Sequence, residues 1–197
     1  MKPLSQQYSW TSSRKRKQRI KKIIMQIAAY LLGLFIVVML AMFLVRAFGN
    51  SCVVIDQSMS PSLKSEDKVL INKMAYRVGS PKRMDVIAMK IGSSENSTTY
   101  IRRVIGVPKD KVKISDGKIY VNDKEIKTEY NDKSIEDAGA AKDGITLDED
   151  TYFVLCDNYN GSKEDSRLDS IGTVNSDQIS GRVWMVISPL SRLHIVK

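Results

Sequence analysis

Ser58 is the first residue of this chain whose type and surroundings suggest chemistry. It stands in a turn after a short β-branched run at 53–55, with Met59 as an apolar neighbour and Pro61 behind it. Because proline fixes its own φ at about −65°, this turn would hold the hydroxyl in a defined direction at the end of a strand. Serines in turns serve mostly to form the turn, so the stretch alone does not establish a nucleophile.

The stretch lies just beyond an apolar segment that predicts a membrane anchor. Residues 23–45 contain no charged side chain, and Gln26 is their only strongly polar one. A helix needs about 20 apolar residues to cross the hydrocarbon core of a bilayer. We therefore predict a basic cytoplasmic tail at 1–22, a transmembrane helix at 23–45 and an exported, β-rich domain at 46–197.

The charges that flank this segment predict its orientation. Residues 1–22 hold eight Lys or Arg and no acid. A dense positive flank stays on the cytoplasmic side, so the protein would cross the plasma membrane once, with the domain beyond Arg46 outside. A cleavable signal peptide ending at 47–49 is the alternative, but its apolar core would span only about 7–15 residues.

The formal net charge of +9 comes entirely from the first 46 residues, because residues 47–197 sum to zero. The basic run could bind nucleic acid, but its place directly before an apolar span is explained by topology alone. With 197 residues, 43% of them hydrophobic, the chain can build one sizeable folded domain. The composition favours a membrane-anchored protein with no nucleic-acid partner.

The cysteines and the histidine do not form a metal-binding pattern. Cys52 and Cys156 lie far apart in an exported domain, where they could pair or could be two small buried hydrophobic side chains. Neither has a His or Cys neighbour at metal-ligand spacing, and His194 is almost at the carboxyl terminus. We predict no metal, no cofactor and no cysteine protease dyad.

Strand patterns dominate the exported domain and predict a mainly β fold. Short apolar or β-branched runs bounded by turn residues occur at 68–73, 85–90, 98–107, 151–156 and 179–188. Residues 111–126 alternate polar and apolar around Asp116-Gly117, a strong hairpin dipeptide. We expect 179–188 to be the last strand and to close the sheet, and 130–150 to be a surface insertion or a flexible loop.

The apolar side chains around the serine predict a surface that lies against the membrane, because they follow the anchor so closely. Exposed apolar patches, when large, are normally interaction sites. The side chains concerned are Val53, Val54, Ile55, Met59 and Leu63.

Three separated segments carry a recognisable series of motifs. The first is Ser58-Met59-x-Pro61-x-Leu63, and the second is 100–108, which ends in Gly-Val-Pro. The third is Asp157-Asn158, followed by Asp165-Ser166-Arg167 and Gly172. In this order after an anchor, they resemble the boxes of the bacterial type I signal peptidases, also called leader peptidases. The resemblance covers the anchor and nearly all of the exported domain.

The resemblance implies a β-rich peptidase domain at the membrane surface that removes signal peptides from exported precursor proteins after small residues. Its partners would be those precursors and the lipid bilayer. It implies that Ser58 is the nucleophile and that the Ser58 backbone N–H helps to hold the oxyanion. A serine hydroxyl attacks well only when a base takes its proton, and the family uses a lysine that is neutral in an apolar pocket.

The resemblance places Arg102 at the position of that catalytic lysine. A guanidinium is effectively never deprotonated in a protein. Arg102 could therefore orient the hydroxyl or stabilise negative charge, but it could not accept a proton. Lys64, Lys90 and Lys109 are conceivable substitutes, and the base should lie within about 2.6–3.2 Å of Ser58 Oγ.

The other motif residues are expected to support the site. The resemblance implies an ion pair between Asp165 and Arg167 that braces the active-site loop, with ordinary loop solvation as the alternative. It also makes Ser162 a candidate to hydrogen-bond the catalytic pair formed by the serine and its base. The remaining supporting residues are Met59, Pro61, Arg103, Asp157 and Asn158. The sequence departs from the family pattern at Lys109, Cys156 and Tyr159, and by one extra residue before Asp165.

Three functions remain to be weighed. The first is a membrane-bound serine endopeptidase of the signal peptidase type. The second is a non-catalytic relative that binds precursors or assists the assembly of surface proteins, which the loss of the lysine would permit. The third, a soluble Ser/Lys autoprotease or repressor with a similar β fold, is disfavoured by the anchor and by the lack of a DNA-binding domain. Arg102 discriminates between the first two.

Overall fold

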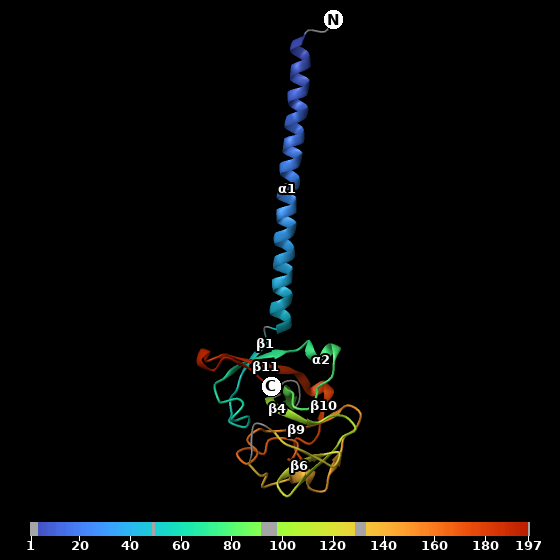
Figure 1. Ribbon diagram of the computed structural model, residues 1–197, viewed down its shortest axis with the longest axis vertical. Coiled ribbons are helices and arrows are strands. Elements are labelled where there is room, and N and C mark those ends of the chain that lie inside the picture. Colours follow the sequence, from blue (N-terminus) through green and yellow to red (C-terminus); the bar gives the residue numbers. More distant parts are fainter. Residues whose placement is uncertain (1–3, 49, 92–97, 129–132, 197) are drawn as a thin grey trace. The chain divides into compact units, whose positions relative to one another are not determined.

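The computed structural model describes residues 4–48, 50–91, 98–128 and 133–196. The chain divides into two compact units, Met1–Arg46 and Ala47–Lys197. The first is built on one helix, α1 (Leu4–Phe48), and the second holds the strands (Figure 1). The structure is mainly β with one amino-terminal apolar helix, so the predicted fold class is confirmed.

Helix α1 contains a stretch, Arg19–Phe43, that is long and apolar enough to cross a membrane. It has 25 residues, and its apolar 18-residue window has a mean hydropathy of 2.6. Its large apolar side chains are exposed, as Leu32 and Phe35 illustrate with 61% and 62%. A helix that is apolar on all sides suits the hydrocarbon interior of a bilayer. The helix also runs through the basic residues 14–22, so it begins well before the apolar stretch.

Eight of the described strands form one antiparallel sheet in the second unit. Their order is β1-β2-β11-β3-β4-β9-β10, and β12 pairs with β11. The strands are β1 (Asn50–Val53), β2 (Lys68–Asn72), β3 (Val86–Ile91), β4 (Thr98–Gly106), β9 (Thr151–Leu155), β10 (Val174–Asn175), β11 (Ile179–Ser188) and β12 (His194–Ile195). Short helical turns connect some of them: α2 (Ala75–Val78), η2 (Ser176–Gln178) and η3 (Leu190–Arg192).

Strand β11 lies in the interior of this sheet, between β2 and β3. The prediction that 179–188 is the last strand and closes the sheet is therefore wrong, although its bounds are those of β11. Val183 and Val186 are fully buried because they pack in the hydrophobic cluster that also contains Val69. The chain continues through η3 into β12, which pairs with β11 at Met185 and Val186.

A second sheet is formed by four of the described strands in the order β7-β6-β5-β8. They are β5 (Lys111–Ser115), β6 (Lys118–Val121), β7 (Lys124–Ile126) and β8 (Ile145–Thr146). The predicted hairpin turns at Asp116 and Gly117, with φ of 51° and 71°. A second tight turn at Asn122 and Asp123, with φ of 51° and 61°, divides the expected second arm into β6 and β7. Positive φ at both central residues is the signature of type I′ hairpin turns.

The segment after the second sheet's hairpins is more ordered than the sequence suggested. Residues 130–132 lie outside the described ranges, but from 133 onward the chain forms η1 (Gly139–Lys142) and β8. Ile135, Ala141 and Leu147 are 5%, 0% and 3% exposed. The prediction of a surface insertion is thus wrong for this part, because three apolar side chains spaced among polar ones pack into the core.

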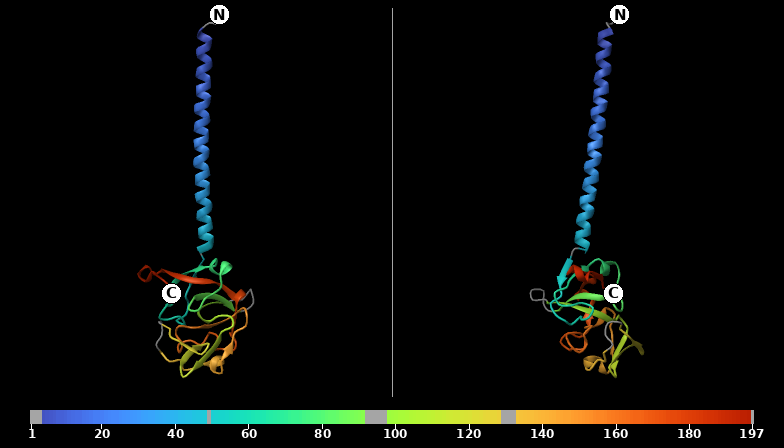
Figure 2. Two further views of the ribbon diagram at one scale, coloured as in Figure 1. Left: turned by 45° about the vertical axis from the view of Figure 1, so that its right-hand side comes forward. Right: turned by 60° about the vertical axis from the view of Figure 1, so that its left-hand side comes forward.

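The two sheets lie toward opposite ends of the second unit, with β1 and β11 at one end and β6 at the other (Figures 1 and 2). One hydrophobic cluster packs under β1, β2, β3 and β11 and includes Met59 and Leu63 from the turn that carries Ser58. A second cluster joins β4 and β9 to the second sheet and includes Phe153. The turn is therefore fixed by core side chains rather than lying free on the surface.

The packing between β4 and the second sheet can be tested at Gly106. A Cβ atom there would lie 2.5 Å from Val112 Cγ2 and 2.8 Å from Leu147 Cδ1. We expect Gly106→Ala to lower the free energy of unfolding by about 1–3 kcal/mol, measured by urea unfolding of the full chain in detergent. Lys113→Ala, at an exposed position of β5, should change it by no more than about 0.5 kcal/mol. Equal stability of the two variants would contradict the close packing.

Candidate active site

Ser58 lies in a turn that hydrogen bonds hold at both ends. Val54 pairs with the chain at 66–67, since its N–H donates to Asp67 O at 2.9 Å. Leu63 N–H donates to Met59 O at 2.8 Å, and the Ser60–Pro61 peptide bond is cis. The carbonyl of Ser58 accepts a hydrogen bond from Asn158 N–H at 2.8 Å, so the loop after β9 is tied directly to the serine.

The predicted apolar surface around Ser58 is wrong for most of its members. Val54, Met59 and Leu63 are 3%, 0% and 0% exposed, and Ser58 itself is 2% exposed. Of the five apolar residues, Val53 and Ile55 alone remain open, at 50% and 87%. Side chains alternate along the extended residues 53–55, so every second one enters the core. That any part of this surface meets a membrane stays a prediction.

The Ser58 hydroxyl is held between a carboxylate and a guanidinium. Ser58 Oγ donates to Asp56 Oδ1 at 2.6 Å and accepts from Arg102 Nη1 at 2.8 Å. Asp56 Oδ1 also accepts from Ser58 N–H at 3.2 Å. Sequence reasoning missed Asp56, although an aspartate two residues before a serine in a turn is the usual position for such a backbone contact.

Arg102 brings a fixed positive charge to this site from β4. Its side chain is 1% exposed, with Nε donating to Glu164 O at 2.5 Å and Nη1 donating to Ile101 O at 2.7 Å. Among the described residues, Nη2 is buried without a hydrogen-bond partner. The carboxylates of Glu164 and Asp56 lie 3.6 and 3.9 Å from Nη2, close enough to offset part of the cost of burying the cation.

The lysines considered as substitutes do not contact Ser58 within the described ranges. The amine of Lys109 pairs with Glu149 Oε1 at 3.2 Å and is 75% exposed. The side chains of Lys64 and Lys90 are exposed. The nitrogen within hydrogen-bond reach of the Ser58 hydroxyl therefore belongs to Arg102, which can only donate.

A buried ion pair links the predicted supporting residues Arg103 and Asp157. Arg103 Nε and Nη2 each lie 2.7 Å from a different oxygen of Asp157. Ser62 Oγ donates to Asp157 Oδ2 at 2.5 Å, and Arg103 Nη1 donates to Met84 O at 2.8 Å. Because Ser62 ends the turn that carries the serine, this network joins the turn, β4 and the loop after β9.

A second buried pair organises the loop between residues 157 and 167. Arg167 Nε and Nη2 lie 2.9 and 2.8 Å from the two oxygens of Asp165, and both side chains are almost fully buried. Asp165 Oδ2 also accepts from Cys156 N–H at 3.0 Å. The pair is bidentate and buried, so the alternative of ordinary loop solvation is excluded. It fixes the loop whose Glu164 carbonyl receives the Arg102 Nε–H.

Ser162 and the cysteines have no direct contact with the Ser58 hydroxyl in the part of the chain that the structure describes. Ser162 Oγ accepts from Glu164 N–H at 3.4 Å. Cys52 and Cys156 are both free. Burial raises the pKa of the Cys156 thiol to about 12, although the nearby Arg102 charge acts in the opposite direction. The thiol is therefore neutral near pH 7 and is no competing nucleophile.

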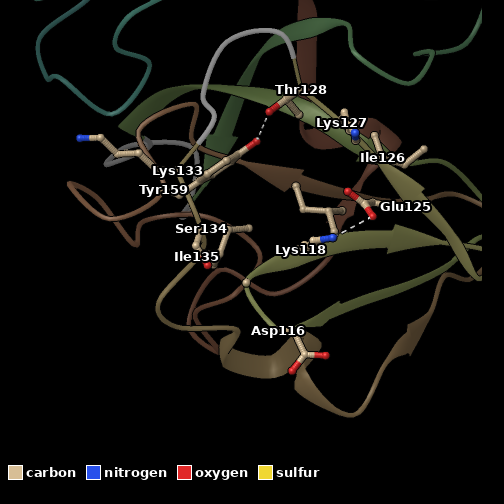
Figure 3. A pocket seen from close by; sticks show the side chains of 12 residues that line it. Asp116, Lys118, Glu125, Ile126, Lys127, Thr128, Lys133, Ser134, Ile135 and Tyr159 are labelled. Atoms are coloured by element: carbon tan, nitrogen blue, oxygen red, sulfur yellow. Dashed lines mark hydrogen bonds and ion pairs between the residues drawn. The ribbon is translucent and has the colours of Figure 1, made fainter.

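Two pockets lie at different places relative to Ser58. A small groove runs between residues 52–56 and β4 at 99–101, and Asp56 is part of its wall. A larger cavity of about 340 Å³ lies on the second sheet, where Lys118 pairs with Glu125 and Thr128 meets the Tyr159 hydroxyl (Figure 3). Neither Ser58 nor Arg102 lines the larger cavity. The small groove therefore contains Asp56, the hydrogen-bond partner of Ser58, in its wall.

Comparisons with known proteins agree with the motifs. A family model described as "Signal peptidase, peptidase S26" matches residues 27–188. Signal peptidase I P of Bacillus subtilis subsp. natto is 32% identical over 93% of this chain and 98% of its own length. Signal peptidase I U of Bacillus subtilis is 26% identical over 95% and 98%. A solved signal peptidase I from Enterococcus faecalis aligns with 26% identity and a TM-score of 0.41, covering 56% of this chain and 98% of that one.

The network behind the serine can be tested at Asp157. Asp157→Asn deprives the buried Arg103 guanidinium of its carboxylate, and we expect a loss of about 3–5 kcal/mol in the free energy of unfolding. Lys163→Gln, which breaks the exposed pair with Asp137, should cost at most about 1 kcal/mol. Thermal and urea unfolding of the full chain in detergent would measure both. Similar small losses in the two variants would contradict a bracing role for the buried pair.

Proposed function

This chain belongs to the signal peptidase family, peptidase S26, and from that premise we propose that it is a membrane-bound serine endopeptidase. Its substrates are exported precursor proteins, from which it removes the signal peptide after small residues. One apolar helix, Arg19–Phe43, supplies the anchor that such an enzyme needs at the bilayer.

The observation that carries this proposal is the pairing of the Ser58 hydroxyl. Its hydrogen is directed at Asp56 Oδ1, and its oxygen faces the guanidinium of Arg102. A nucleophilic serine needs an acceptor for its proton, and a nearby positive charge stabilises the negative charge that develops on the oxygen. Both needs are met within 2.8 Å of Ser58 Oγ.

The small groove offers a place for the precursor's cleavage segment. It is walled by the extended residues 52–56 and by β4 at 99–101. An extended peptide can bind beside a strand through main-chain hydrogen bonds, with alternate side chains entering the protein. A segment bound there passes Asp56, which hydrogen-bonds the serine, and so its scissile carbonyl approaches Ser58.

A second candidate is a non-catalytic relative that binds precursors or assists the assembly of surface proteins. The observation that favours it is Arg102 itself, because the guanidinium that replaces the family's lysine cannot accept a proton. Ser58 is 2% exposed, which also favours a non-catalytic role because a substrate must reach the hydroxyl. Such a protein would bind a precursor through the same groove and leave it intact.

Cleavage assays on Arg102 and Ser58 variants separate the two candidates. We expect the wild type to cleave a precursor with an Ala-x-Ala site and Ser58→Ala to be inactive. Arg102→Lys adds an amine, which is a stronger base than a carboxylate, so it should cleave faster than the wild type. Adding Ser58→Ala to it should abolish the gain.

The advantage of Arg102→Lys should grow as the pH rises, because only the neutral amine can take the proton of Ser58. The carboxylates of Asp56 and Glu164 favour the protonated amine, so the neutral form appears at higher pH. Cleavage rates measured between about pH 6 and 9 on gels would show this. A wild type that binds the precursor without cleaving it, beside an active Arg102→Lys variant, would establish the non-catalytic role.

The orientation of the anchor is part of the proposal. Eight basic residues precede the apolar stretch, so the tail at 1–22 stays in the cytoplasm and the domain at 46–197 lies outside. Protease added to intact cells should remove the carboxyl-terminal domain and spare a tag placed at the amino terminus. A cytosolic protein assayed in parallel controls for lysis. Protection of the domain would overturn this orientation.

A further inference from the structure

We propose that Asp56 is the proton acceptor that activates Ser58, in the role that the family's lysine would fill. This inference rests on the proposed peptidase function and names a further catalytic residue for it. Asp56 lies outside the motif residues that pointed to the family, and the structure alone brings its carboxylate to the hydroxyl.

The direction of the Ser58 hydrogen follows from the inventory of donors and acceptors. Arg102 Nη1 is 2.8 Å from Ser58 Oγ and can only donate, because a guanidinium has no acceptor. The hydroxyl hydrogen is then free to point to Asp56 Oδ1, which is 2.6 Å away. That distance lies within the range of about 2.6–3.2 Å expected between a general base and the group it deprotonates.

The exposure of Asp56 suits a group that must pass a proton on. Its side chain is 48% exposed, while that of Arg102 is 1% exposed. Asp56 also lines the small groove beside β4. A carboxylate at that wall can reach a leaving amine in the groove as well as the serine.

The reaction balances with these groups and one water molecule. The Ser58 O–H bond breaks, its proton moves to Asp56 Oδ1, and Oγ bonds to the scissile carbonyl carbon while the C=O π electrons move to oxygen. As the C–N bond breaks, Asp56 gives the proton to the leaving amine. A water then attacks the ester, its proton passes to Asp56, and that proton returns to Ser58 as the acid is released.

Arg102 acts in this scheme as a positioning and electrostatic group. Its charge lies beside Ser58 Oγ and favours the anionic oxygen as the proton leaves. Its Nη2, 3.9 Å from Asp56 Oδ2, keeps the carboxylate close to the hydroxyl. The alternative role for Asp56 is purely structural, because its Oδ1 also accepts the Ser58 backbone N–H at 3.2 Å.

The decisive variant is Asp56→Asn in the full-length protein in detergent, studied with two readouts. One is cleavage of an Ala-x-Ala precursor, and the other is labelling of Ser58 by a fluorophosphonate probe, which needs an activated hydroxyl but no precursor. We expect both rates to fall at least about 100-fold, with kcat reduced far more than KM. Glu164→Gln removes a carboxylate that lies 3.6 Å from Arg102 Nη2, against 3.9 Å for Asp56, but makes no contact with Ser58 in the described part of the chain, and it should cost at most about fivefold.

Asp56→Asn made in the Arg102→Lys protein tests whether Asp56 is a general base or a structural residue. In Arg102→Lys the amine can take the proton, so adding Asp56→Asn should leave most of the activity and move its rise to lower pH, because the amine loses a neighbouring negative charge. An equal loss in both backgrounds would mean that Asp56 only holds the turn and would overturn the inference. Retained activity supports it and shows that Asp56→Asn still folds.

The remaining outcomes distinguish this inference from the proposed function. Wild-type cleavage that Asp56→Asn leaves unchanged overturns the role of Asp56 and leaves the peptidase standing. Labelling of Ser58 that depends on Asp56, without cleavage of any precursor, supports Asp56 as acceptor and overturns the peptidase. Labelling no greater than that of Ser58→Ala, together with no cleavage, overturns both.

Discussion

The buried pair of Arg103 and Asp157 is the interaction on which the site depends. It joins β4 to the loop after β9, and through Ser62 it also holds the end of the turn that carries Ser58. Arg102, the preceding residue on β4, points to the opposite face because side chains alternate along a strand. Strand β4 thus supplies Arg103 for the buried pair and Arg102 for the positive charge beside the Ser58 hydroxyl. A shift of one residue in the register of β4 would exchange their positions.

Arg102 determines the electrostatic character of the site. The guanidinium donates to several acceptors at once, including the carbonyls of Ile101 and Glu164. A neutral amine would need apolar surroundings, whereas a permanent cation needs carboxylates nearby. Asp56 and Glu164 meet that need, and Asp56 is at the same time placed against the serine.

Much of the fold and of the site was predictable because it follows from local patterns. The β-branched runs gave the main strands, and the order of motifs identified the residues around Ser58. What escaped prediction depends on tertiary pairing. Burial of Ile135 and Leu147 comes from a second sheet, the interior place of β11 comes from its partners, and the contact of Asp56 arises only when the turn is formed.

The order of strands in the large sheet has a consequence for how the protein matures. Strand β2 pairs with β11, near the end of the chain, instead of with its successor β3. Pairings between distant segments close slowly, because the entropy of a long loop is lost before the contacts form. The large sheet, which carries both arginines on β4, therefore stays incomplete until residues 179–188 have been synthesised and have paired with β2 and β3.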